Sequence, residues 1–319
     1  MQLSRPVVFI CFLLSATLIT PAMAQNLVAM FSISGDRQVG SIDPTTGIAT
    51  LNGSPINGGS PMNSFGGSGY DASTNTLYIV GNPGAVNSVV DVALPAGTVS
   101  TVALTGNNPN SVEYDVAEAT IYAVFSVAGD RQAGSINTAT GVVTMLGSPI
   151  GGVSISTSAN ATLDATGNRL FFVGTPTAGV ASIYTVNTGT GAATVQALSP
   201  ASIISMLAYN STNGTLYALV SVGGGGRQLG TINPGTGAVA LSGSAFDGGA
   251  SISTTSDGIA IDEATGTLYF AGNTSSIYTV NLTTGAATSQ TITGGGTSVV
   301  SLEFDPGALP VTLSRFSVD

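Results

Sequence analysis

The chain is 319 residues long and carries a formal net charge of −10, with 16 acidic residues against six basic ones, all of them arginine. Charged residues make up 7% of the sequence, against about a quarter in an ordinary globular protein. So few cations exclude nucleic acid and anionic lipid surfaces as partners, because both are bound by basic patches. The hydrophobic fraction of 43%, spread over short periodic runs, predicts a packed core and not a disordered chain.

The first 24 residues have the pattern of a secretory signal. Arg5 precedes an apolar run from Val7 to Ile19, and Ala22-Met23-Ala24 forms an A-x-A cleavage site. This run is too short for a membrane span, and no later stretch of the sequence is long enough to cross a bilayer. The one cysteine, Cys11, lies in the same segment, so the mature chain has no disulfide or thiol chemistry. We therefore expect a secreted or cell-surface protein whose mature chain does not insert into a membrane.

One motif is written three times along the mature chain. The segment FSISGDRQVGSID at 31–43 returns as FSVAGDRQAGSIN at 125–137 and as VSVGGGGRQLGTIN from Val220. The arginines Arg37, Arg131 and Arg227 are separated by 94 and then 96 residues. A fixed period of this kind indicates a fold assembled from stacked copies.

Each long repeat contains two related halves, and each half predicts two β-hairpins. The first hairpin pairs an apolar-Asp/Asn segment with a Leu-Tyr-like segment, as in 70–78, 114–122, 163–171, 209–217 and 261–269. The second has Asp or Asn, a Thr-Gly turn and a strand of small or β-branched residues, as in 42–47, 136–141, 186–191, 232–237 and 280–285, with a variant at 92–98. Asp, Asn and Gly suit tight turns, and the alternating residues suit a pleated sheet. Two hairpins make a four-stranded antiparallel blade of about 45 residues.

The two ends of the mature chain complement each other. The first strand after the signal, Leu27 to Phe31, matches the second strand of a blade, while a spare first strand occurs at Val299 to Phe304. We therefore predict an all-β fold: a six-bladed β-propeller of four-stranded antiparallel blades, closed by N-terminal and C-terminal strands that share blade one. Closure would also remove sheet edges. The domains expected are a signal peptide at 1–24, the propeller at 25–305 and a C-terminal tail at 306–319.

These hairpin motifs carry a family resemblance. The repeated Leu-Tyr strands and the Asp/Asn-x-x-Thr-Gly turns resemble the secreted bacterial propellers of the YVTN and NHL repeat class over nearly all of the mature chain. The tail LPVTLSRF at 309–316 resembles a segment that follows the ordered domain of exported Bacteroidetes-type proteins and leads there into further modules or a sorting domain. The resemblance implies an exported protein and leaves the mode of surface attachment open.

Missing residue types limit the chemistry. Without histidine, lysine or a mature cysteine, the chain cannot form a Ser-His-Asp or Cys-His nucleophile, a Schiff base, a phosphate-binding loop with its lysine, or a histidine or thiolate zinc site. Carboxylate, tyrosine, hydroxyl and arginine chemistry remains.

The repeated Arg-Gln pairs are the first candidate site. They are expected in the loops between the second and third strands of alternate blades, and a guanidinium suits carboxylate, sulfate or sugar hydroxyl groups. The alternative is that each arginine pins its own loop to a carbonyl or a neighbouring blade. The candidate ligand-binding residues are Arg37, Gln38, Arg131, Gln132, Arg227 and Gln228.

Two glutamates are the second candidate. Glu113 and Glu303 occupy the same position in predicted first strands, which line the channel of a propeller. Paired carboxylates there could hold Ca²⁺, as in the six-bladed lactonases, or act as an acid/base pair. The alternative is that they are solvated channel carboxylates without a ligand.

From these features we expect a binding module and not an enzyme. Its partners would be extracellular glycans or surface proteins, with no cofactor required. The expected surface carries the Arg-Gln loops and three long connections, 53–67, 147–159 and 243–257, because loops on a rigid scaffold commonly carry recognition. The alternative function is a divalent-metal-dependent hydrolase, lactonase-like or glycosidase-like, that uses Glu113, Glu303 and Ca²⁺ in the central channel.

Overall fold

The computed structural model describes residues 27–62, 65–106, 108–150, 155–157, 160–176, 179–273, 275–296 and 298–306. The predicted signal peptide and the LPVTLSRF tail lie outside the described residues. Apart from three short 3₁₀ turns (η1 Pro83–Ala85, η2 Gly223–Gly225 and η3 Phe246–Gly249), the regular elements in these ranges are β-strands. Within the same ranges, no helix has the length and apolar character needed to span a membrane.

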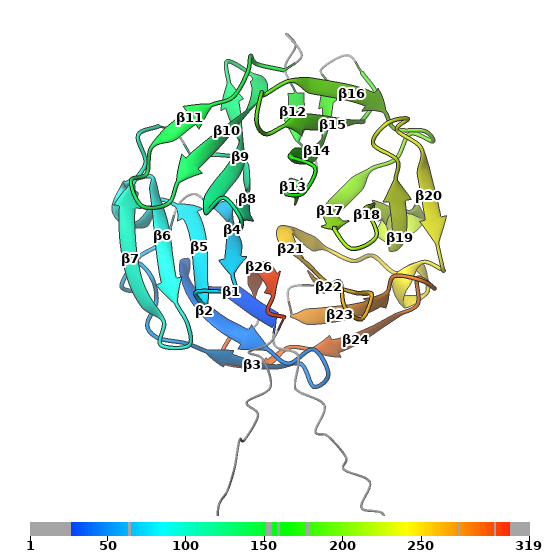
Figure 1. Cartoon of the computed structure of the whole chain (residues 1–319). Coiled ribbons are helices and arrows are strands. Elements are labelled where there is room, and N and C mark those ends of the chain that lie inside the picture. Colours follow the sequence, from blue (N-terminus) through cyan, green and yellow to red (C-terminus); the bar gives the residue numbers. More distant parts are fainter. Residues whose placement is uncertain are drawn as a thin grey trace, which may run out of the picture.

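The strands form antiparallel sheets arranged like the sectors of a wheel, each running from an inner strand to a perimeter strand (Figure 1). Four sheets have four or five strands each and follow chain order closely. The first sheet has β4 Phe65–Asp71, β5 Thr76–Gly81, β6 Ser88–Ala93 and β7 Thr98–Ala103, and the second has β8 Ser111–Asp115, β9 Thr120–Val127, β10 Asp130–Asn137 and β11 Val143–Met145. The third has β12 Ile155–Thr157, β13 Thr162–Asp164, β14 Arg169–Pro176, β15 Ser182–Asn187 and β16 Ala193–Ala197. The fourth has β17 Ile204–Asn210, β18 Thr215–Ser221, β19 Arg227–Ile232 and β20 Val239–Ser242.

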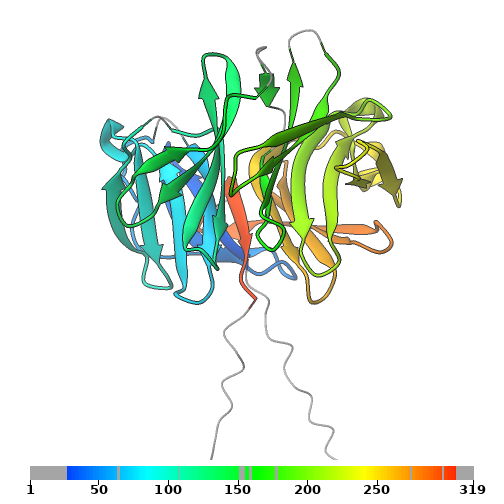
Figure 2. The ribbon, with the colours of Figure 1, turned by 45° about the horizontal axis from the view of Figure 1, so that its top comes forward.

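A nine-stranded sheet holds both ends of the described chain, and its strand order is β24-β23-β22-β21-β26-β1-β2-β3-β25. A single parallel bridge, Asp257 with Ser301, joins β21 to β26, whereas β26 and β1 pair antiparallel from Leu27 opposite Phe304 to Phe31 opposite Val299. The predicted pairing of these two segments is therefore present, and the first and last strands of the described chain lie in the same sector (Figure 2). The strands are β21 Thr254–Asp262, β22 Thr267–Gly272, β23 Ser276–Asn281, β24 Ala287–Thr291, β25 Thr293–Gly294, β26 Val299–Phe304, β1 Leu27–Ile33, β2 Asp36–Ile42 and β3 Ile48–Leu51.

The predicted hairpins are confirmed, and their turns show why these residues recur. The Asp71 carboxylate accepts hydrogen bonds from the backbone N–H of Ser73 and Thr74, which closes the turn between β4 and β5. In the second type of hairpin, Asn187 accepts from the Thr190 N–H and hydroxyl, and Gly191 takes a φ of +70°. These local bonds satisfy turn backbone that no strand partner can reach.

Hydrophobic side chains fill the space between adjacent sheets. One such cluster joins Tyr122 and Val124 of β9 to Phe172 of β14 and Tyr184 of β15, and the rings of Phe172 and Tyr184 stack at 4.8 Å between centroids. Sheet-on-sheet packing of this kind buries both faces of the second strands, as five consecutive buried residues in β9 and in β14 show. Most of the driving force for the fold therefore comes from contacts between sectors.

Glycines let neighbouring sectors approach at the perimeter. A Cβ atom on Gly191 would lie 2.1 Å from the backbone nitrogen of Gly147. In the repeat-equivalent pairs, a Cβ on Gly97 would lie 2.6 Å from the Gly53 Cα, and one on Gly285 would lie 2.8 Å from the Gly243 nitrogen. Both backbones occupy the space that a side chain would need. The three-fold recurrence of these glycines is therefore a packing requirement.

Candidate ligand-binding cavity at the centre of the wheel

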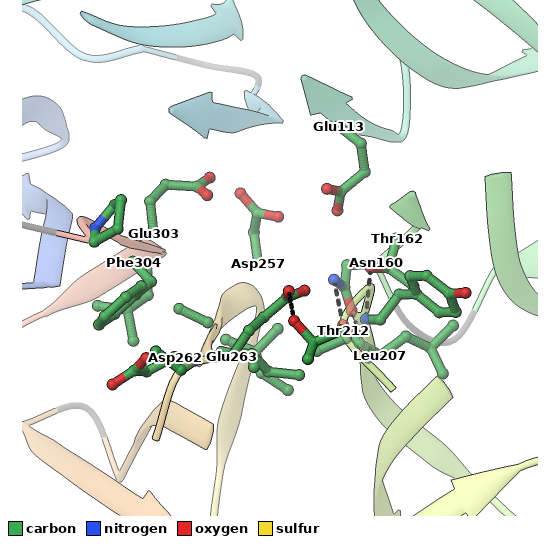
Figure 3. A pocket seen from close by; sticks show the side chains of 18 residues that line it. Glu113, Asn160, Thr162, Leu207, Thr212, Asp257, Asp262, Glu263, Glu303 and Phe304 are labelled. Atoms are coloured by element: carbon green, nitrogen blue, oxygen red, sulfur yellow. Dashed lines mark hydrogen bonds between the residues drawn. The ribbon is translucent and has the colours of Figure 1, made fainter. Parts of the chain in front are cut away.

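The inner strands surround a cavity of about 530 Å³. Its walls come from β8, β13, β17, β21 and β26, which belong to sectors far apart in the sequence. Figure 3 shows carboxylates from three of these strands extending into the space between them. None of the described residues that line the cavity is basic.

Three half-buried carboxylates define the character of this cavity: Glu113 from β8, Asp257 from β21 and Glu303 from β26. Ser68, a buried residue of β4, joins two of them. Its hydroxyl lies 2.8 Å from Oε1 of Glu303 and 3.4 Å from Oδ2 of Asp257, and its backbone N–H donates to the same Asp257 oxygen at 3.0 Å. Ser68 therefore holds these two acids in place, while Glu113 extends from the opposite wall (Figure 3).

Burial disfavours the charged form of all three acids, and repulsion from neighbouring carboxylates adds to this for Asp257 and Glu113. Desolvation raises the pKa of Glu303 to about 7, although the bond from Ser68 opposes the shift. Desolvation, and then the charge of Glu303, raise the pKa of Asp257 well above its ordinary value; the pKa of Glu113 is raised by burial and by the charges of Glu303 and Asp257. Carboxylates that lie close together in a partly dehydrated site raise one another's pKa in this way. A cation in the cavity would stabilise their charged forms and lower these pKa values again.

The rest of the wall is mixed. It includes two further acids, Asp262 and Glu263, and an apolar part formed by Leu207, Ile259, Ile261 and Leu302 with the aromatic ring of Phe304. The arrangement suits a positively charged group carried on an apolar stem, because the stem can lie along this wall while the charge meets the acids. Among the described residues, no group of three or more His, Cys, Asp or Glu side chains has the arrangement of a metal site.

Asn160 lines the same cavity, but its side chain is hydrogen-bonded to backbone groups of the protein. Its side-chain oxygen accepts from the Leu207 N–H at 2.8 Å and its amide donates to the Leu207 carbonyl at 2.9 Å. The residue is 4% exposed, so its Asn-x-Thr sequence cannot serve as a glycosylation acceptor in the folded protein.

The structure brings the two predicted glutamates to one cavity and adds a residue that the sequence interpretation missed. Asp257 was placed at the end of a long connection, but it lies within β21, which begins at Thr254. The register of β21 shifts between Thr254 and Ile259, so its alternation is interrupted next to the aspartate. The sequence signal that could have located this residue is a single acidic residue, Asp257, a few positions before the predicted inner-strand segment Ile261-Asp262.

The Arg-Gln pairs lie elsewhere and do not line this cavity. Their arginines are at the start of the third strands β2, β10 and β19, and not in the preceding loops as expected. Each guanidinium Nη1 donates to carbonyls of its own loop: Arg37 to Gly35 at 3.2 Å, Arg131 to Asp130 at 3.2 Å and Arg227 to Gly225 at 2.8 Å. These contacts match the loop-pinning alternative.

The glutamines of the same pairs hold the perimeter glycines. Gln38 donates to the Gly53 carbonyl, Gln132 to that of Gly147 and Gln228 to that of Gly243, all at 2.8–2.9 Å. These are the glycines that abut the next sector. The repeated motif therefore fixes the contact between alternate blades and their successors.

Comparisons with known proteins support the fold. No protein-family model matches the chain, and no curated protein matches its sequence. One solved structure with a similar fold is TolB from Acinetobacter baumannii, with a TM-score of 0.62 and 10% sequence identity; the match covers 89% of this chain and 67% of the TolB chain. Another is a chain of a nidogen/laminin complex, with a TM-score of 0.58 and 12% identity, which covers 88% of this chain and 98% of that chain. A structural genomics protein from Bacteroides thetaiotaomicron is also similar, with a TM-score of 0.53 and 13% identity over 87% of this chain and 78% of that chain. Together with the radial sheets, these matches identify a β-propeller, and at such low identity they show the fold alone.

Proposed function

We propose that this protein is an exported, six-bladed β-propeller that acts as a binding module outside the cell, and that its central cavity receives a basic side chain of an extracellular protein. The observation that carries the proposal is the set of Glu113, Asp257 and Glu303, contributed by three separate sectors to one cavity without a basic residue in its described lining. The nidogen/laminin structure shows a similar fold in a protein complex, which is consistent with this role.

The strand pairings support a count of six blades. The nine-stranded sheet divides at the single β21–β26 bridge into β21–β24 and β26-β1-β2-β3, which join the four smaller sheets. The second unit combines the last described strand with the first three. Closure of the ring by strands from both ends of the chain would hold the cavity walls at fixed positions.

Charge favours a basic protein group over the other partners considered. A lysine or arginine side chain has an apolar stem for Ile259, Ile261 and Leu302, and a cationic end for the three acids. An acidic glycan would be repelled by the same carboxylates. Complementary charge also speeds encounter and selects against partners of the wrong sign.

Peptides provide the test. Calorimetric titration should show that lysine- and arginine-containing peptides bind, that matched peptides with norleucine in their place do not, and that affinity falls as salt rises. The triple variant E113Q/D257N/E303Q should lose this binding. The control D43N/E118Q/D130N removes three acids outside the cavity lining and should retain it. Equal binding by both variants, or binding of neutral glycans alone, would overturn the proposal.

The hydrolase alternative has one specific observation in its favour, namely carboxylates of raised pKa on opposing cavity walls. Panels of lactones and glycosides should give no turnover, and the melting temperature should be the same in Ca²⁺ and in EDTA. Turnover that disappears in E113Q, or a melting temperature that rises with Ca²⁺, would favour the metal-dependent enzyme instead.

A further inference from the structure

The perimeter of the wheel has an unusual composition. The outermost strands of the sectors are β3, β7, β11, β16, β20 and β24, as Figure 1 shows. Their sequences are IATL, TVSTVA, VTM, ATVQA, VALS and ATSQT, without a charged residue or a proline in any of them. Charges and prolines are the usual means by which proteins prevent pairing at sheet edges. These edges have no such protection.

Exposed apolar side chains gather on the same strands. Ile48, Met145, Val195 and Leu241, which lie on β3, β11, β16 and β20, are 38–54% exposed. Val195 also lines a surface groove of about 590 Å³, together with Pro149, Ile150 and Tyr184, and no described residue of that groove is charged. Apolar surface of this kind marks contact sites with other macromolecules.

Among the described perimeter strands, β7, β16 and β24 pair only with β6, β15 and β23. The outer edges of the other three are contacted at their beginning by the preceding sector: β3 pairs with β25, the Val143 N–H of β11 donates to the Thr105 hydroxyl, and the Val239 N–H of β20 donates to the Ser199 carbonyl. β7, β16 and β24 are five or six residues long. The next sector crowds their last residues: a Cβ on Gly141 would meet the Ala103 carbonyl at 2.0 Å, one on Gly237 that of Ala197, and one on Gly47 that of Thr291. The preceding sector contacts Gly97, Gly191 and Gly285, which come just before their first residues. Most residues between these two contacts are exposed.

We propose that copies of this protein associate side by side, through antiparallel pairing of the edges of β7, β16 and β24 with the same edges of a second copy. Each edge is compatible with itself, because pairing centred on Thr101, Val195 or Ser289 sets no charged residue opposite another. The net charge of this chain is −10, but the acids among the described residues lie on the inner and middle strands and in the loops instead of on these strands. Contact between copies requires such a neutral surface, since like charges would otherwise be brought together.

The three edges recur at repeat-equivalent positions. Thr101, Val195 and Ser289 are separated by 94 residues each, all are exposed, and they pair with Val90, Tyr184 and Tyr278 of the preceding strands. A molecule with three self-complementary edges can extend beyond a dimer. Backbone pairing supplies the attraction, as in other cases of strand addition.

Analytical ultracentrifugation of the purified protein over a wide concentration range tests this inference. The wild type should form dimers and larger species as concentration rises, and more readily at higher salt, because salt screens the net negative charge. The variant T101K/V195K/S289K should lower the association constant about tenfold or more. The control A72K/A117K/T166K adds the same charge at exposed positions on inner turns and should associate at least as well as the wild type.

A wild type that stays monomeric at every concentration and salt overturns the inference, as does equal dissociation of both lysine variants. Circular dichroism and melting of each variant establish that the fold is retained. If T101K/V195K/S289K does not fold, the single variants T101K, V195K and S289K take its place, each expected to weaken association in part. Peptide binding to the cavity is measured separately, so the two proposals can fail independently.

Discussion

The hydroxyl of Ser68 lies 2.8 Å from Oε1 of Glu303, and this hydrogen bond joins residues that are 235 positions apart in the chain. Ser68 belongs to β4, and Glu303 to β26 at the end of the described chain. The bond therefore ties two neighbouring sectors together at the cavity wall. It also partly offsets the cost of burying the Glu303 carboxylate.

The cavity carboxylates should make the protein less stable as the pH rises from 5 to 8. The pKa of Glu303 is raised from 4.5 to about 7, so its contribution is fully present below about pH 4.5 and is lost as the pH rises through about 7. Asp257 and Glu113 shift in the same direction. The melting temperature should therefore fall between pH 5 and pH 8, and the fall should be smaller in E303Q. A melting temperature that rises over this interval would contradict the assignment.

Removal of the Ser68 hydroxyl should destabilise the protein and raise the pKa of Glu303 further. Ser68 is 2% exposed and bonds to two carboxylates, so S68A should cost about 1–2 kcal/mol in the free energy of unfolding at pH 8, measured with urea. The double variant S68A/E303Q isolates the coupling between the two residues. Strictly additive effects would show that the bond contributes nothing.

Loss of the arginines should affect stability more than binding. Their Nη1 groups donate to backbone carbonyls of their own loops, so the variant R37A/R131A/R227A should lose about 1 kcal/mol of unfolding free energy per site. Charge reversal to glutamate should cost more, because carboxylates would then face carbonyl oxygens. Peptide binding in the cavity should be unchanged. Full stability combined with loss of a glycan or protein partner would instead support these residues as a ligand site.

Alanine substitutions at two glycines with similar φ angles, Gly191 and Gly58, distinguish the cost of a steric clash from the cost of a strained backbone conformation. G191A should cost about 3 kcal/mol or more, because its Cβ would overlap the backbone at Gly147. G58A has a φ of +62° but no neighbouring atom within 4 Å, so only the left-handed conformation is penalised, by about 1 kcal/mol. Chemical denaturation of both variants makes the comparison. Similar losses would mean that close contact between sectors does not limit the fold.

Local sequence was sufficient to predict the hairpins, because their determinants are local. Asp71 and Asn187 close turns within three residues of themselves, and Gly191 permits the φ that its turn requires. The placement of Glu113 and Glu303 on inner strands followed from the same regularity. Asp257 was missed because a shifted register in β21 breaks the alternation on which the prediction rested.

Turn chemistry and alternating side chains, both readable from neighbouring residues, thus establish an all-β chain of repeated hairpins. They contain no information about which atoms meet at the axis, since that depends on how sectors hundreds of residues apart are oriented. The tertiary structure alone brings Ser68, Asp257 and Glu303 into contact and sets Glu113 across from them. It alone shows that the Arg-Gln pairs bond to their own backbone, and which perimeter strands keep an open edge.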